Sequence, residues 1–89
     1  KTKDGVGEKH LPVVTKKDGG ILVSVGEVEH PMLKEHHIMW IEVLTEKEVL
    51  RANLKPGDKP EAFFNVDYDK VNLVREYCNL HGLWSLNLK

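Results

Sequence analysis

The chain has 89 residues, a formal net charge of −1 and charged side chains at 30% of its positions. This length predicts one domain over residues 1–89, and the balanced charge gives no electrostatic support for binding nucleic acid. A single cysteine excludes a disulfide within the chain, and no apolar run approaches the ~20 residues that a membrane span needs. We therefore expect neither nucleic acid nor a membrane as a partner.

One free cysteine and the absence of a signal-peptide pattern suit a reducing compartment, so we expect a cytoplasmic protein. A domain of this size buries only ~60–65% of its unfolded surface, and a bound metal is one way to add stability. The sequence begins at Lys1, which leaves open a processed start or an upstream domain. The sequence does not determine the oligomeric state, and a homo-oligomer is one of the open alternatives.

The first third of the chain predicts a flexible arm, two strands and a loop. Residues 1–8 are polar, contain two glycines and read as the arm. Strands are expected at residues 11–17 and 21–25, because Asp18-Gly19-Gly20 between them is a hairpin signal. Residues 27–37 have no clean period and contain Pro31, so they predict a loop.

The rest of the chain predicts five more strands, at residues 38–44, 49–54, 62–66, 71–78 and 83–88. Charged or Pro/Gly-rich breaks separate them, the clearest at residues 55–60. Val71, Val74 and Cys78 also share one helical face, so a helix over residues 71–77 is the alternative there. Seven short strands with turns between them predict an all-β sandwich.

Metal-binding side chains are unusually dense, with one cysteine and five histidines in the chain. Thiolate and imidazole together suit zinc, copper, iron or nickel. Cys78-x-x-His81 places two donors on one tight loop. His36 and His37 would point to opposite sides of an extended segment, so both would not reach one metal. The even spacing from His30 favours His36.

The donor inventory narrows the choice of metal. A structural zinc site usually has several cysteines, and a blue-copper site has two histidines, one cysteine and an axial methionine. No methionine follows His81; Met32 and Met39 lie far upstream. A non-haem iron centre with four histidines and one thiolate accounts for more of these side chains than a zinc or a copper site does. A cupredoxin-like electron-transfer protein and a non-catalytic sandwich with a stabilising metal are the alternatives.

Three segments together resemble the superoxide reductase family, which includes neelaredoxin and the C-terminal domain of desulfoferrodoxin. They are Glu8-Lys9-His10-Leu11-Pro12-Val13, His30-Pro31-Met32-Leu33-Lys34-Glu35-His36-His37-Ile38 followed by Trp40-Ile41-Glu42, and Cys78-Asn79-Leu80-His81-Gly82-Leu83-Trp84. They occur in the family's order and at similar spacings, from residue 8 to residue 84. The two-iron members add an N-terminal domain with four cysteines, which this chain lacks. It is therefore similar either to neelaredoxin or to the C-terminal part of a longer chain.

The resemblance implies an immunoglobulin-like β-sandwich with one mononuclear iron that alternates between the ferrous and ferric states. It implies four equatorial imidazoles and one axial thiolate, opposite an open position; these ligands are His10, His30, His36, His81 and Cys78. His37 lies outside this set.

Two further residues have roles by resemblance. Glu8 resembles the glutamate that occupies the open position in the oxidised state, and Lys9 the cation that attracts an anionic substrate. The implied reaction is the one-electron reduction of superoxide to hydrogen peroxide. A small redox protein similar to rubredoxin would return the electron.

Overall fold

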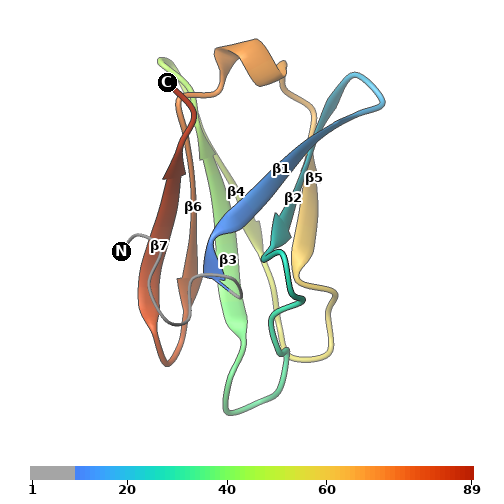
Figure 1. The fold of residues 1–89 in the computed structure, drawn as a ribbon, viewed down its shortest axis with the longest axis vertical. Coiled ribbons are helices and arrows are strands. Elements are labelled where there is room, and N and C mark those ends of the chain that lie inside the picture. The colour runs from blue at the N-terminus through green and yellow to red at the C-terminus, as the bar shows by residue number, and fades with distance from the viewer. Residues whose placement is uncertain (1–9) are drawn as a thin grey trace.

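The computed structural model describes residues 10–89, so the expected arm at residues 1–8 lies outside the described residues (Figure 1). It contains seven strands: β1 (Pro12–Lys17), β2 (Gly20–Val25), β3 (Ile38–Leu44), β4 (Val49–Asn53), β5 (Glu61–Phe64), β6 (Leu73–Cys78) and β7 (Gly82–Asn87). A short 3-10 helix, η1 (Tyr68–Lys70), precedes β6. All seven expected strands are present, and the segment with a helical alternative is a strand.

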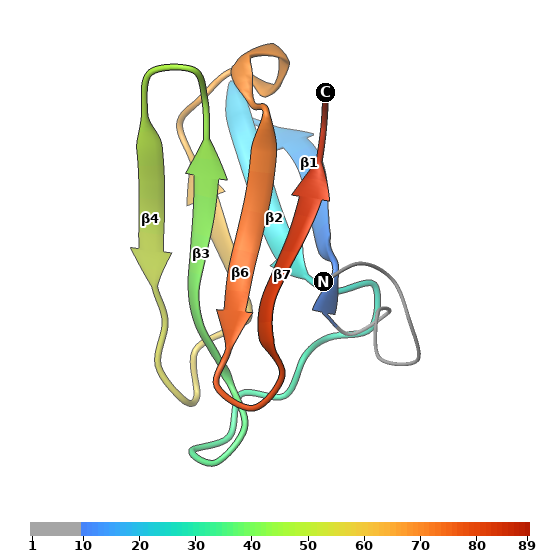
Figure 2. The ribbon, with the colours of Figure 1, turned by 90° about the vertical axis from the view of Figure 1, so that its left-hand side faces the viewer.

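The strands form two antiparallel sheets that pack face to face (Figures 1 and 2). One sheet has the order β1-β2-β5 and the other the order β4-β3-β6-β7. This is the sheet arrangement of an immunoglobulin-like sandwich, in which the third strand pairs with the sixth. The predicted fold class is therefore confirmed.

Alternating side chains of both sheets fill the space between them. The central strand β2 contributes Ile21, Val23 and Val25, which are all almost fully buried. From the opposite sheet, β3 and β6 contribute further aliphatic side chains to the same cluster. Burial of one face of each sheet is the main source of stability in such a fold, because apolar area leaves water there.

The turns follow the chemistry of their residues. In the β1–β2 hairpin, Asp18 and Gly19 have φ values of 49° and 81°. Positive φ at both positions is what a type I′ turn needs, and Asp-Gly is a preferred pair for it. Before β6, the N–H of Val71 still donates to the Tyr68 carbonyl of η1, so the strand begins at Leu73 and not at the expected Val71.

A charged cluster crosses the outer face of the four-stranded sheet. The Glu42 carboxylate accepts hydrogen bonds from Arg51 Nε at 2.7 Å and from Arg75 Nε at 2.6 Å. Burial raises the pKa of Glu42, but the hydrogen bonds and charges of Arg75 and Arg51 outweigh it and hold the pKa below its ordinary value. The Arg51 guanidinium also lies 4.3 Å from the ring centroid of Trp40.

Antiparallel pairing brings several strand ends to the same end of the sandwich. β1 and β3 begin there, β2 and β6 finish there, and the β6–β7 turn lies beside the long β2–β3 connection (Figure 2). Residues far apart in the chain therefore meet at this end. Within residues 10–89, no helix is long and apolar enough to cross a membrane.

Candidate metal centre

Five of the predicted site residues lie at this end of the sandwich. His10 lies two residues before β1, Cys78 is the last residue of β6, and His81 lies in the turn before β7. His30 and His36 come from the β2–β3 connection. His10, His30 and Cys78 are buried, and the other two are half-buried.

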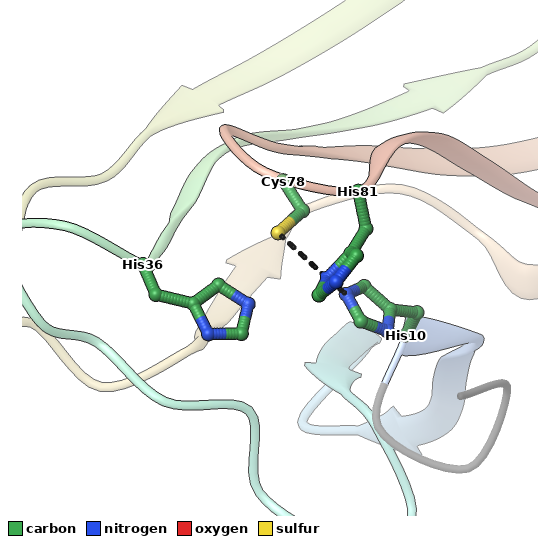
Figure 3. Close-up of side chains that lie close together, drawn as sticks. All are labelled: His10, His36, Cys78 and His81. Atoms are coloured by element: carbon green, nitrogen blue, oxygen red, sulfur yellow. Dashed lines mark hydrogen bonds between the residues drawn. The ribbon is translucent and has the colours of Figure 1, made fainter.

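Four of these side chains converge on one small volume (Figure 3). One donor atom from each of His10, His36, Cys78 and His81 lies within 4.8 Å of all the others. Metal–nitrogen bonds of ~2.0–2.1 Å and metal–sulfur bonds of ~2.3 Å place donors on opposite sides of one ion about 4–5 Å apart. The spread of the four atoms therefore fits a single metal ion.

His30 joins the same cluster. Its Nε2 lies 3.0 Å from His10 Nε2 and 3.5 Å from Cys78 Sγ. His81 Nδ1 lies 3.1 Å from the same His10 nitrogen. Two nitrogens bound to one ion at right angles would be about 3 Å apart. The spacing of the three imidazoles thus matches that of neighbouring ligands.

The four imidazoles form a square. Adjacent ring centroids are 4.6 Å apart for His10–His30, 4.7 Å for His30–His36, 5.0 Å for His36–His81 and 4.8 Å for His81–His10. The His10–His36 diagonal is longer, at 6.4 Å. Cys78 Sγ contacts the rings at two opposite corners, at 3.5 Å from His30 and 3.8 Å from His81. One thiol therefore caps a square of four imidazoles.

The ring of His30 is held in the neutral, metal-binding form. Its Nδ1 lies 2.7 Å from the Pro31 carbonyl oxygen, which can only accept, so Nδ1 carries the proton and Nε2 presents its lone pair to the cluster. Burial, together with the neighbouring imidazoles, lowers the pKa of His30 to about 4 against the opposing effect of the Pro31 hydrogen bond. Near neutral pH the ring is uncharged, as metal binding requires.

A tryptophan whose role the sequence did not predict supports His10. Trp84 is fully buried, and its ring stacks on that of His10 at 4.7 Å between centroids and 20° between planes. Trp84 pairs with Glu76, two residues before Cys78, so its side chain lies on the face of the sheet that carries Cys78. This packing fixes the plane of the His10 imidazole.

A buried carboxyl group lies two residues before Cys78. Glu76 is fully buried, and neither of its oxygens has a hydrogen-bond partner within residues 10–89. Burial raises the pKa of Glu76 to about 9. The group is therefore a neutral acid near pH 7 and adds no negative charge beside the thiol.

The structure does not test the two other predicted site residues. Glu8 and Lys9 lie outside the described residues, so their roles stay predictions. His37 has one ring nitrogen, Nδ1, buried away from any hydrogen-bond partner among residues 10–89, and its ring is not part of the square. The ligand roles of the five clustered residues also stay predictions.

The copper alternative is not favoured. It needs two imidazoles and a methionine sulfur beside the thiolate. The structure instead gathers four imidazoles around Cys78. The sulfur of Met32 accepts a hydrogen bond from the Ile38 N–H at 3.4 Å.

Comparison with known proteins points to one family. A sequence model of the family described as Desulfoferrodoxin matches residues 2–87. A desulfoferrodoxin of Syntrophotalea carbinolica is 52% identical over 84 residues, which cover 94% of this chain and 66% of that protein. The chain thus spans slightly less than two thirds of the length of this relative.

Solved structures agree with the sequence match. A superoxide reductase from Treponema pallidum superimposes with a TM-score of 0.83 at 40% identity, covering 93% of this chain and 68% of that one. A superoxide reductase (1Fe-SOR) from Giardia intestinalis gives a TM-score of 0.75 at 31% identity, covering 92% and 98%. The resemblance found in the three motifs is confirmed, and the chain belongs to the desulfoferrodoxin and superoxide reductase family.

Proposed function

We propose that the chain is a superoxide reductase whose single iron is held by His10, His30, His36, His81 and Cys78. The observation that carries this proposal is the square of four imidazoles capped by one thiol. Five donors in this arrangement leave one position for a small ligand, on the face opposite Cys78. When bound, the iron supplies the one electron that, with two protons, converts superoxide into hydrogen peroxide.

The cluster residues have distinct parts in this reaction. The imidazoles bind as neutral ligands and leave the overall charge of the site to the metal and the thiolate. Cys78, as a thiolate, would donate electron density to the iron, as a proximal cysteine does in some haem enzymes. This donation favours release of the reduced product.

Lys9 and Glu8 act at the open face in this proposal. Both lie within two residues of His10 in the sequence, and His10 is buried in the cluster. The Lys9 ammonium would attract the superoxide anion and stabilise the developing peroxide charge. Glu8 would take the open position once the product has left.

The reaction needs an external electron for every turnover. The structure describes one cluster of metal-ligand side chains, and residues 10–89 offer no second one of three or more. We propose a small redox protein of the rubredoxin type, by family resemblance. A cytoplasmic location would keep the Cys78 thiol reduced.

Metal analysis and rapid kinetics test the proposal. We expect one iron per chain after expression in iron-sufficient cells. The anaerobically reduced protein should then consume one superoxide per iron and form one peroxide without releasing oxygen. The proposal would be wrong if the protein contained stoichiometric copper or zinc without iron. It would also be wrong if the reduced iron protein did not react with superoxide.

A further inference from the structure

We infer that Asn79 is a positioning residue that ties the loop carrying His36 to the turn carrying Cys78 and His81. The inference rests on the proposed function, because it concerns how three of the proposed iron ligands are held. Its basis is a set of hydrogen bonds between segments more than 40 residues apart in the sequence.

Asn79 forms three hydrogen bonds to the two residues that flank His36. Its side-chain Oδ1 accepts from the His37 N–H at 2.8 Å, and its Nδ2 donates to the Glu35 carbonyl at 3.1 Å. Its own backbone N–H donates to the His37 carbonyl at 3.2 Å. Asn79 is therefore hydrogen-bonded to the backbone on both sides of His36.

The loop around His36 is closed by its own backbone hydrogen bonds. Leu33 and His36 exchange two backbone hydrogen bonds, at 2.9 and 3.0 Å. This small turn fixes the shape of the loop but not its distance from the β6–β7 turn. The hydrogen bonds of Asn79 set that distance, one residue beyond the point where Ile38 pairs with Cys78.

Asparagine suits this position for a chemical reason. Its short side chain offers an acceptor and a donor at once, which the His37 N–H and the Glu35 carbonyl both require. Aspartate would keep the acceptor and lose the donor, and alanine would lose both. A series of two substitutions thus removes the side-chain contacts one after the other.

The expected effect is on metal retention. Residues that orient metal ligands typically change metal affinity 10–100-fold when they are replaced. For Asn79→Ala we expect ferrous iron to leave about 10-fold faster than from the wild type. For Asn79→Asp we also expect faster release, because the donor to the Glu35 carbonyl is replaced by a carboxylate oxygen that repels it.

The experiment measures transfer of ferrous iron from each protein to a chelator under anaerobic conditions. The visible thiolate-to-ferric charge-transfer band of the oxidised proteins is a second readout, since it depends on the position of Cys78 relative to the other ligands. Leu80→Ala is the matched control, because Leu80 lies in the same turn and is 61% exposed. Its release rate and band should equal those of the wild type.

The outcomes separate the inference from the proposed function. Wild-type release and an unchanged band in Asn79→Ala would overturn the inference; if that variant does not fold, the same result in Asn79→Asp would overturn it. If the wild type takes up no iron, the proposed function is wrong. Amide exchange of His37 in the metal-free protein then tests the inference: faster exchange in Asn79→Ala supports it, and equal exchange overturns it.

Discussion

The imidazole of His10 lies almost parallel to the indole of Trp84, 20° between the two planes. The indole is fully buried, so it forms a rigid surface behind one corner of the imidazole square. Replacing Trp84 should therefore affect the candidate metal site as well as the stability of the core.

Trp84→Leu should lower the free energy of unfolding by about 2–3 kcal/mol, because it leaves a cavity in the core. It should also lower iron occupancy, because His10 loses its stacking partner. Trp84→Phe keeps an aromatic face and should retain iron. Trp40→Leu, on the outer face of the sheet, is the control and should leave occupancy unchanged. Chemical denaturation and iron analysis measure both effects, and full occupancy in Trp84→Leu would contradict the prediction.

Cys78→Ser should abolish the thiolate-to-ferric charge-transfer colour of the oxidised protein. The reason is that this absorption needs a sulfur ligand, and Cys78 is the only cysteine in the chain. A visible spectrum of the oxidised variant, recorded with its iron content, is the measurement. If the band persists in the variant, Cys78 is not a ligand.

His36→Ala should lose iron, whereas His37→Ala should retain it. His36 takes one corner of the imidazole square, and the side chain of His37 lies outside it. The two variants are matched controls for each other, since they are neighbours in the same loop. Iron content of the purified proteins decides the matter, and the reverse order would overturn the ligand assignment.

Lys9→Ala should slow the second-order reaction with superoxide about 10-fold, because the variant loses the electrostatic attraction that raises the association rate of an anion. It should not lower iron content, since Lys9 is not a proposed ligand. Added salt should slow the wild type more than the variant, because the Debye length is only ~8 Å at physiological ionic strength. Pulse radiolysis at several salt concentrations measures both rates. Equal rates with equal salt slopes would show that Lys9 does not attract the substrate.

Glu42→Gln should destabilise the protein by about 2 kcal/mol at pH 7, because charged hydrogen bonds to two arginines are lost. The pKa of Glu42 is lower in the folded state than its ordinary value of 4.5, so its contribution is present above that pH. The contribution is lost as the pH falls through the folded-state pKa. Unfolding curves from pH 7 downward should therefore converge for wild type and variant.

The matched control for that comparison is Glu48→Gln, which changes an exposed glutamate in the β3–β4 turn. This substitution should alter the free energy of unfolding little at pH 7 or at acid pH, since an exposed charge contributes little to stability. A gap between wild type and Glu42→Gln that stays constant down to acid pH would contradict the role of the charge.

The fold was largely predictable because its signals are local. Alternating apolar residues, the Asp18-Gly19 turn and the Pro/Gly break near residue 57 define where strands begin and end. The strand boundary near Val71 was not predictable, because it depends on a hydrogen bond within η1. Apolar composition alone does not show where such a turn ends.

The candidate site was predictable in its residue types but not in its geometry. The three motifs indicate all five candidate ligands, but the order of imidazoles around the square depends on how five strand ends meet. The stacking of Trp84 on His10 and the hydrogen bonds of Asn79 to the His36 loop join segments far apart in sequence. Such contacts become visible only once the sheets are packed.

The β3–β4 turn at residues 45–48 divides the candidate ligands into two groups. His10, His30 and His36 precede it, whereas Cys78 and His81 follow it. Each sheet would also receive strands from both halves, since β2 pairs with β5 and β3 with β6. A chain split at this turn would give two fragments that are colourless apart. Iron would bind only where the halves reassemble, so the absorbance itself would report fragment complementation.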